Sequence, residues 1–382
     1  MNCPVSPPRS ADRNKYVKLT ATWDTHTSMK HFEFWPPRLF EAPYYLALAW
    51  GCLRNGLAPR SLAKANYALD HGELGLGSKF STQLAFDQGH FPATELLSTV
   101  DSGGLDANKT RAELWAEQIS NFANKQGYPV IVKPDIGAVG KGVQMVSSQN
   151  EIEGVVASLQ VDQLLQAFCT EPCEFGVFYV RESGTGRISG INKKHFPTVV
   201  GDGKHTLQQL AEQHPRYTQH WSIFLNHNDL THTPKNKEEV RLSFIGSHTM
   251  GCKFTDATDL QTPELANALN HLCEPQPGFN FGRLDVRAAS DAAFQRGEFV
   301  VIEVNGIASL PTHMFDPDYR LRDAYKIFLE HARLLTSIAA EHRAKEMQID
   351  SYGELWARAK SNAQALDAQH DRARQVTAGR VD

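Results

Sequence analysis

Apolar and polar residues alternate in two short runs in the last third of the chain. Residues 281–287 and 299–305 are rich in Phe, Val and Leu, with charged or amide side chains at alternate positions. Alternation with a period of two predicts β-strands whose two faces differ in polarity. We therefore expect the two runs to form a β-hairpin with a polar connection between its strands.

The predicted hairpin brings acids and an amide together. Alternation places three side chains of each strand on one face. They are Arg283, Asp285 and Arg287 in the first strand, and Val301, Glu303 and Asn305 in the second. Three oxygen ligands that converge in this way are costly without a cation, because a carboxylate among apolar neighbours is expensive to leave unpaired. Such hard ligands suit Mg²⁺ better than zinc, with a phosphate chain completing the coordination. The alternative is a surface hairpin with solvated charges.

A second pattern joins a buried strand to a glycine-rich turn. The apolar run Val130–Val132 delivers Lys133 at its end, and residues 143–146 predict a returning strand. The glycines between them are Gly137, Gly140 and Gly142. A lysine in this place reaches a phosphate as a point charge, and glycines let backbone amides approach the same group. The pattern matches neither GxxxxGK[ST] nor GxGxxG. The alternative is a glycine-tipped hairpin whose lysine serves solubility.

The remaining periodicity outlines the rest of the chain. Helical patterns cover residues 109–126, 151–159, 262–274, 318–345 and 352–366. Thr206 with Gln209 three residues on is a capping-box pattern, so we interpret Thr206 as a helix cap and not as a catalytic hydroxyl. Residues 240–245 predict a strand, whereas residues 214–240 are polar and predict a loop or short helices over the site.

One apolar stretch has the character of a nucleotide hinge. Residues 164–168 predict an extended strand whose free backbone groups would pair with the edge of an adenine. Glu174 follows soon after and suits ribose hydroxyls as a hydrogen-bond acceptor. An ordinary core strand is the alternative.

Composition narrows the classes of function. The 382 residues predict two or three domains or lobes. The net charge of -4, from 39 basic and 43 acidic residues, gives no electrostatic case for nucleic acid or an anionic membrane. The apolar run Tyr44–Leu53 is too short to cross a bilayer, and the N-terminus lacks a signal-peptide core, so we expect a cytoplasmic protein. The six scattered cysteines predict buried thiols and not a disulfide framework.

The two ends of the chain are less informative. Residues 1–30 are polar and predict a flexible arm, and residues 31–97 predict a small α/β cap with aromatic clusters. Lys79 follows a glycine-rich turn in this cap, and the pattern leaves open whether its side chain is solvated. We expect residues 367–382 to be frayed.

Taken in order, these motifs resemble those of the ATP-grasp superfamily of carboxylate-amine ligases, in particular its D-alanine–D-alanine ligase and cyanophycin synthetase-like branches. PVIVKPDIGAVGKGV is similar to the lysine strand and phosphate-covering loop, LLQAF to the adenine hinge, and CEF to the hinge glutamate. FPTVVGDGKHTLQQL resembles a segment of the cyanophycin synthetase-like members, and GRLDVR with VIEVNGIAS resembles the metal-binding end. The resemblance covers residues 95–340.

The resemblance implies an α/β (α+β) fold of the ATP-grasp type, in which two lobes grip ATP. The implied parts are the arm at 1–30, the N-terminal cap at 31–97, the ATP-grasp domain at 98–345 with lobes 98–165 and 166–345, and a C-terminal helical tail at 346–382.

It also implies a set of site residues. The nucleotide would contact Lys133, Gly140, Lys141, Gly142, Gln166, Ala167, Phe168, Glu174 and Lys194. Two Mg²⁺ ions, with Mn²⁺ as an alternative, would be held by Asp285, Glu303 and Asn305. Arg283 would be the catalytic residue, against the acyl phosphate and the tetrahedral oxyanion, and the substrate would contact Arg287, Ser309 and His248. For His248 and His313, a proton carrier, a substrate contact and a hydrogen-bonded structural histidine are all open.

Two positions depart from the family pattern. Gln166 stands where acidic residues are frequent, and GIASL replaces the ligases' TSPG after Asn305, which leaves the acceptor substrate open.

The implied activity is an ATP- and Mg²⁺-dependent ligation. A substrate carboxylate attacks the γ-phosphate to give an acyl phosphate, and an amine then displaces phosphate to form an amide or peptide bond. Small carboxylates and amines, such as amino acids or short peptides, are the expected partners, and both a monomer and a homo-oligomer remain open. The alternatives are a small-molecule kinase with the same fold and a non-catalytic ATP-binding protein.

Overall fold

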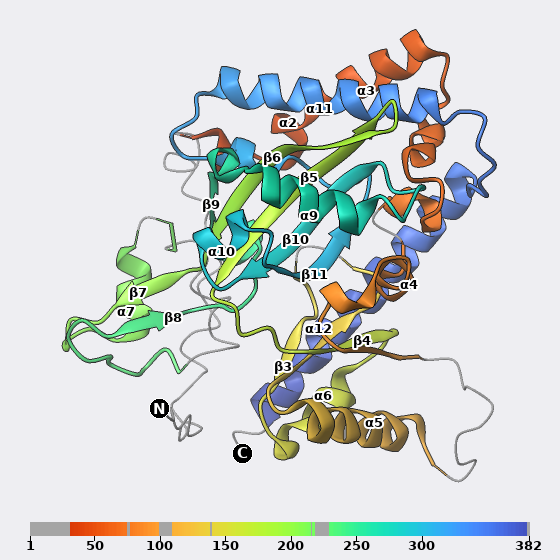
Figure 1. Cartoon of the computed structure of the whole chain (residues 1–382). Coiled ribbons are helices and arrows are strands. Elements are labelled where there is room, and N and C mark those ends of the chain that lie inside the picture. The colour runs from red at the N-terminus through yellow and green to blue at the C-terminus, as the bar shows by residue number, and fades with distance from the viewer. Residues whose placement is uncertain are drawn as a thin grey trace.

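The computed structural model describes residues 31–74, 77–98, 109–137, 140–214, 216–217 and 229–379. The arm predicted at 1–30 lies outside these ranges, as do residues 215 and 218–228 of the loop predicted at 214–240. Within them, two antiparallel sheets lie one above the other in Figure 1, and a small two-stranded ribbon stands to one side. The expected mixture of helices and strands is confirmed.

The first lobe is a four-stranded sheet covered by two helices. Its strand order is β1-β4-β2-β3, with bounds Thr94–Leu97, Gln163–Ala167, Val130–Pro134 and Gln144–Val146. Helices α5 (Arg111–Gln126) and α6 (Ile152–Ser158) pack on it through Trp115, Ile119, Phe122, Ile152 and Val156. The predicted helices at 109–126 and 151–159 are therefore confirmed. Thr110 and Glu113 form a capping box, which fixes the start of α5.

Strand β1 shows where the first lobe begins. The sequence places residues 94–97 at the end of the cap, but β1 pairs with β4 from Thr94↔Gln166 to Leu97↔Gln163. This pairing buries Leu97 in the core of the first lobe, where it is fully covered. The sheet of the first lobe thus reaches back to Thr94 and forward to Ala167.

The second lobe is a five-stranded sheet with the order β11-β10-β5-β6-β9. The bounds are Val300–Asn305, Phe281–Ala288, Cys173–Glu182, Thr185–His195 and Lys253–Asp256. Helices α9 (Pro263–Cys273) and α10 (Asp291–Gln295) cover one face, where Phe175 stacks on Phe294. On the other face, α11 (Leu321–Glu341) covers the half of the sheet that is farther from the first lobe, through Leu334, Leu335 and Ile338. The half of that face nearer the first lobe forms the floor of a pocket.

A β-bulge shifts the predicted hairpin. Asp285 pairs with Glu303, but Val286 pairs with Val301, so Ile302 is the extra residue. Val301 is consequently buried in the core with Val286, and its predicted placement on the face of Glu303 is wrong. The predicted polar connection between the strands contains the short helix α10.

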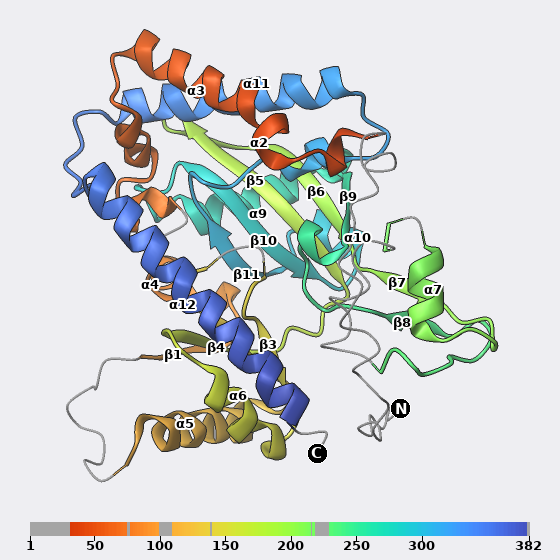
Figure 2. The same ribbon diagram turned by 180° about the vertical axis from the view of Figure 1, so that it is seen from behind.

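The cap packs onto the second lobe. It contains α2 (Pro37–Phe40), α3 (Ala42–Asn55) and α4 (Lys79–Leu84), together with the 3-10 helix η2 (Phe32–Phe34). Helix α3 lies along α11 in both Figure 1 and Figure 2. Tyr44 of α3 stacks on Phe328 of α11, with ring centroids 4.6 Å apart, which anchors the cap.

The last helix, α12 (Tyr352–Gly379), is longer than the sequence predicted. Figure 2 shows it running diagonally from the cap to the first lobe. The prediction that residues 367–382 are frayed is wrong as far as Gly379. Gln369 is fully buried and bonded to Gln163, and Leu366 is also buried, so contacts with the first lobe hold this end in place.

Near the small ribbon, the predicted helix cap at Thr206 is confirmed, and one predicted strand has different bounds. Thr206 and Gln209 form the predicted capping box at the start of α7 (Leu207–Gln213). Beside it, β7 (Thr198–Val200) pairs with β8 (Glu239–Arg241), so the strand predicted at 240–245 begins and ends earlier.

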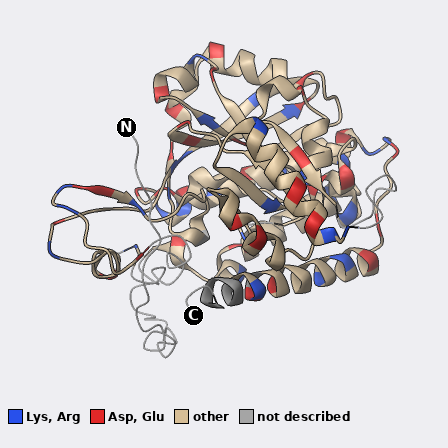
Figure 3. Ribbon diagram, turned by 90° about the horizontal axis from the view of Figure 1, so that it is seen from below, with Lys and Arg blue, Asp and Glu red and all other residues tan. Residues whose placement is uncertain are grey.

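Acidic and basic residues are spread over the molecule and do not gather on one element. Figure 3 shows acidic and basic residues dispersed over the elements. No helix in the described ranges is both long enough and apolar enough to span a membrane.

Candidate functional site

A pocket of about 430 Å³ lies between the two sheets, a volume within the range of ligand sites. Both lobes, the loop at residues 244–248 and the cap contribute to its lining. Most of the predicted site residues line it together: Lys133, Gly140, Lys141, Gln166, Ala167, Phe168, Glu174, Lys194, His248, Arg283, Asp285, Arg287, Glu303, Asn305 and Ser309.

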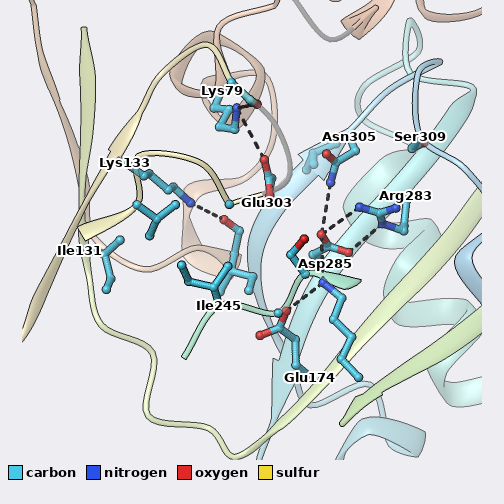
Figure 4. A pocket seen from close by; sticks show the side chains of 18 of the residues that line it. Lys79, Ile131, Lys133, Glu174, Ile245, Arg283, Asp285, Glu303, Asn305 and Ser309 are labelled. Atoms are coloured by element: carbon cyan, nitrogen blue, oxygen red, sulfur yellow. Dashed lines mark hydrogen bonds and ion pairs between the residues drawn. The ribbon is translucent and has the colours of Figure 1, made fainter. Parts of the chain in front are cut away.

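The acidic centre of the pocket lies on the paired strands β10 and β11. Asp285 and Glu303 are register partners, as are Arg283 and Asn305, so all four point to one face. Arg283 grips Asp285 with two hydrogen bonds, from Nε to Oδ1 at 2.9 Å and from Nη2 to Oδ2 at 3.2 Å. The Asn305 amide donates to Oδ2 of Asp285 at 3.4 Å. Figure 4 shows Asp285 between Arg283 and Asn305, with Glu303 lying toward Lys79.

The surroundings of Asp285 keep its carboxylate charged. Burial alone would raise its pKa, but Arg283 and Lys194 outweigh burial and hold the pKa below the usual value. Lys194 Nζ lies 3.2 Å from Oδ2 of Asp285. Burial lowers the pKa of Lys194, while Asp285 and Glu174 raise it to a net value above that of a free lysine. The negative charge of Asp285 is therefore balanced by the positive charges of Arg283 and Lys194.

Glu174 is engaged by two cations. Its Oε1 accepts from Lys194 Nζ at 2.8 Å, and its Oε2 accepts from Arg287 Nε at 2.8 Å. Burial raises the pKa of Glu174, but these two cations lower it by more. The net pKa is therefore below that of a free glutamate. The Arg287 guanidinium also donates to the carbonyl of Cys169 and lies 5.9 Å from the ring of Phe168. Arg287 therefore sits beside the predicted hinge.

Lys133 enters the pocket from the first lobe. Its Nζ donates to Gln166 Oε1 at 3.1 Å and to the carbonyl of Ile302, the bulged residue, at 3.2 Å. Burial lowers the pKa of Lys133 and outweighs the opposing effect of Glu303. Lys133 thus bridges the two lobes at the bulge, next to the acidic centre.

The hinge is apolar on its pocket side. Ile131, Phe168, Phe244 and Ile245 line this end of the pocket. Strand β4 has a neighbour on each side, and the Ala167 N–H donates to the carbonyl of Ala93 at 2.9 Å. Residues 164–167 therefore have strand partners on both sides, so the expectation of free backbone groups in residues 164–168 is wrong for this part of the run.

The glycine-rich turn lies under the loop at 244–248. Gly140 has a φ of +75° and faces Ile245 so closely that a Cβ there would overlap the Ile245 side chain. Lys141 lines the pocket and also forms an ion pair with Asp367 of α12. Gly142 lies behind the turn, where it faces Pro134 and Gln369.

The cap contributes a lysine and a glutamate that are not among the predicted site residues. Lys79 Nζ donates to the Gly137 carbonyl at 2.5 Å and lies 3.7 Å from Oε1 of Glu303, so the open question of its solvation is settled in favour of the pocket. Glu73 is buried and accepts from the Thr82 hydroxyl, and burial raises its pKa to about 7. The turn GELGLGSK was the only signal, and it does not indicate where Lys79 points.

The far end of the pocket carries Ser309 and His248. The Ser309 hydroxyl donates to the Gly306 carbonyl at 2.5 Å, and its own carbonyl accepts from His331 at 3.0 Å. His248 Nε2 lies 2.7 Å from Oε1 of Glu33, which belongs to the cap. His313 is buried beneath this end, and burial lowers its pKa.

The described residues contain no cluster of three or more His, Cys, Asp or Glu side chains suited to a metal. The predicted ligand set is of another kind, because it combines two carboxylates with the amide of Asn305.

Comparison with known proteins gives one match in sequence and several in structure. Residues 99–174 match the family model described as carbamoyl-phosphate synthase L chain, ATP binding domain. That stretch includes Lys133, Gly140, Gln166, Phe168 and Glu174. No protein of curated function matches the chain in sequence.

Three enzymes of known structure are among those that this chain resembles in its fold. Carboxyaminoimidazole ribonucleotide synthase from Aspergillus clavatus, complexed with ATP, is 11% identical with a TM-score of 0.35, over 59% of this chain and 44% of that one. A bifunctional glutathione synthetase from Pasteurella multocida is 13% identical with a TM-score of 0.33, over 66% of this chain and 36% of that one. D-alanine–D-alanine ligase from Bacillus anthracis is 14% identical with a TM-score of 0.39, over 77% and 71%.

The match thus spans less than half of the first two enzymes, and with TM-scores below 0.5 these likenesses carry no assignment. The assignment depends instead on the family match and on the geometry of the pocket. The matched segment contains β2, β3 and β4 of the first lobe, and it ends at Glu174 in β5. Two antiparallel sheets hold one charged pocket between them, as the resemblance implied. Residues 99–174 thus match an ATP-binding domain of the ATP-grasp type, and the two lobes around the pocket have the arrangement of the ATP-grasp fold.

Proposed function

We propose that this protein is an ATP- and Mg²⁺-dependent ligase that joins a small carboxylate, such as an amino acid or short peptide, to an amine. The reaction would proceed through an acyl phosphate in the cytoplasm. One observation carries the proposal. Asp285, Glu303 and Asn305 lie on the same face of β10 and β11, beside Arg283 and in one pocket with Lys133.

The residues present fit a magnesium site. Asp285 and Glu303 offer carboxylate oxygens and Asn305 an amide oxygen, which are the ligands that Mg²⁺ prefers. Four lysines line the same pocket, Lys79, Lys133, Lys141 and Lys194, and suit a polyphosphate. We propose two Mg²⁺ ions, with Mn²⁺ as an alternative. When bound, Mg²⁺ would neutralise the charge that develops on the phosphates during transfer.

We assign a separate role in the reaction to each of the protein's own groups. Lys133 would bind the phosphates, because it projects from the first lobe toward the acidic centre. Arg283 would donate to the carbonyl oxygen of the acyl phosphate and to the oxyanion that follows, since its guanidinium lies on the same face as the ligands. The apolar end at Ile131 and Phe168 would hold the adenine. No nucleophilic side chain is needed, because the substrate carboxylate itself attacks the phosphate.

The test measures ADP release and product mass with Mg-ATP and a panel of amino acids and short peptides. We expect ADP and an amide product in equal amounts. The variant Glu303→Gln should lower turnover about 100-fold or more, because it removes a charge that acts only in the site.

The matched control is Glu298→Gln, just before β11, where the side chain is exposed and paired with Arg296. It should turn over at the rate of the unmodified protein. Equal rates in the two variants would reject the proposal. A stable phosphorylated product with no amide would assign the protein as a kinase instead.

A further inference from the structure

Behind the far end of the pocket lies a buried acid that the ligation scheme above does not use. Glu33 lies in η2, and its side chain is 1% exposed. Its carboxylate accepts from Arg216 through both oxygens, at 2.5 Å and 2.8 Å, and lies 2.7 Å from His248 Nε2. His248 lines the pocket, so the cap places a carboxylate directly behind a pocket histidine.

The partner of Nε2 decides which nitrogen of His248 can take a proton. Burial raises the pKa of Glu33, but the hydrogen bonds from His248 and Arg216 outweigh it and hold the pKa below normal. An ionised carboxylate only accepts, so Nε2 must carry the hydrogen in this contact. The second nitrogen, Nδ1, is then the basic one in the neutral ring.

Aromatic rings hold the imidazole in place. His248 stacks on Phe315 with centroids 5.3 Å apart, and it also contacts Phe254 and Phe34. Among the described contacts, the charged or titratable groups around the pair are Glu33, Arg216 and His31, the last 3.9 Å from the Glu33 carboxylate. The neighbours from β9 and from the 3-10 helix η9 (Thr312–Phe315) are the rings of Phe254 and Phe315.

This end of the pocket adjoins the proposed catalytic arginine. Phe315 belongs to η9, whose first residue, Thr312, lines the pocket. Leu310, just before it, accepts from Arg283 Nη1 at 3.5 Å. A substrate held by Arg283 would therefore lie near the segment on which His248 stacks.

We propose that His248 accepts the proton of the acceptor amine, and that Glu33 is the positioning residue that orients it. This inference rests on the proposed ligase function and deepens it, because it assigns the far end of the pocket to the amine. The amine nitrogen forms the C–N bond, and the C–O bond to phosphate breaks. The electron pair of that bond leaves with phosphate, and one nitrogen proton passes to Nδ1 of His248.

Hydroxylamine separates this step from the first half of the reaction. It is a nucleophile that is largely unprotonated at neutral pH, so it traps an acyl phosphate without needing a base. The assay compares hydroxamate formation with amide formation, using common amino acids as carboxylates and either hydroxylamine or a second amino acid as the acceptor.

The variant His248→Gln should lower amide formation about 100-fold or more, as expected for loss of a general base, while hydroxamate formation changes less than about twofold. The control is His271→Gln, at an exposed position of α9, which should leave both rates unchanged.

The variant Glu33→Gln tests the positioning role with a readout that a structural role would not move. It keeps an acceptor for His248 but removes the charge that favours the imidazolium. The acid limb of the pH profile for amide formation should move to lower pH, with a smaller loss of rate than in His248→Gln.

Four results would be decisive against these assignments. Equal losses of amide and hydroxamate in His248→Gln would overturn the base assignment, as would no loss of either. An unshifted acid limb in Glu33→Gln would overturn the positioning role. No hydroxamate from the unmodified protein would overturn the proposed ligase function, and this inference with it.

Discussion

His331 is a buried histidine that holds the loop after the acidic strand. The residue is 3% exposed, its ring packs against Phe178 and Phe281, and its Nε2–H donates to the Ser309 carbonyl at 3.0 Å. Burial lowers its pKa to about 3. The loop that carries Ser309 therefore depends on a histidine that stays neutral in the folded protein.

This histidine predicts an acid sensitivity of stability. Its pKa is lower in the folded state than in the unfolded one, so the unfolded chain binds the extra proton between pH 6.5 and about 3. Stability from this group is therefore present above the unfolded pKa and is lost as pH falls. From pH 7 to pH 5 we expect it to cost about 2 kcal/mol of the free energy of unfolding, measured by urea denaturation at both pH values.

The variant His331→Gln keeps an N–H donor for Ser309 but cannot titrate. Its absolute stability should fall because the ring contacts are lost, but its loss between pH 7 and pH 5 should be about 2 kcal/mol smaller. His232→Gln, at an exposed position, serves as the control and should keep the full pH dependence. The same pH dependence in both variants would contradict the assignment to His331.

The sequence predicted single residues well where their neighbours in the chain defined them. Glu303 stands among apolar residues of its own strand, so its need for a partner followed from the local pattern. Lys79 and Glu33 were not identified as site residues, because their partners, Glu303 and His248, lie far away in the chain. Local pattern carries no information about such contacts.

The hairpin of β10 and β11 is the element that organises the site. Period-two alternation predicted both strands and the pairing of Asp285 with Glu303, which the register confirms. It missed the bulge at Ile302, because an inserted residue leaves the composition of a strand unchanged. The bulge turns the Ile302 carbonyl to Lys133, so the unpredicted irregularity joins the two lobes.

Gly306 ends this hairpin where the cap lies against it. A Cβ at this position would overlap the Glu73 side chain and the Gly72 carbonyl, and the Ile307 N–H donates to the same carbonyl at 3.2 Å. We expect Gly306→Ala to lower the free energy of unfolding by about 1–3 kcal/mol, since backbone must move to admit the methyl group. Thermal or urea unfolding measures the change.

A matched alanine substitution separates this clash from a general effect of removing glycine. Gly353 lies in the first turn of α12, where an added methyl group would have its nearest neighbour 4.0 Å away. Gly353→Ala should be neutral or stabilise the protein by up to about 1 kcal/mol. If Gly306→Ala were as stable as Gly353→Ala, the cap would not constrain the end of the hairpin.

At the scale of the whole molecule, α12 connects parts that are distant in the chain. Near its start, the Tyr352 hydroxyl accepts from the Arg60 N–H at 3.2 Å, and Arg358 pairs with Asp350 at 2.8 Å. Farther along, its contacts are with the first lobe, through Gln369. The sequence predicted a helix here but not its partner, because this helix shows no strong apolar face that would mark a buried side.

Gln369 is the buried contact by which α12 holds the first lobe. Its Oε1 accepts from the Gln160 N–H at 3.1 Å and from Gln163 Nε2 at 3.0 Å. Gln369→Ala leaves both donors without this acceptor, which costs about 1–3 kcal/mol for a buried group. Hydrogen exchange should become faster in β4 and at the end of α6, and unfolding should begin at lower urea.

The same helix supplies its own control. Gln364 is exposed on α12, so Gln364→Ala should change stability by less than about 0.5 kcal/mol and leave exchange in β4 unaltered. Because the substitution and the helix are identical, a difference between the two variants reports the docking of α12 and not its helical propensity. Equal protection of β4 in both would mean that the first lobe keeps its place without α12. Faster exchange in Gln369→Ala alone would show that the last helix braces the sheet from which Lys133 reaches the second lobe.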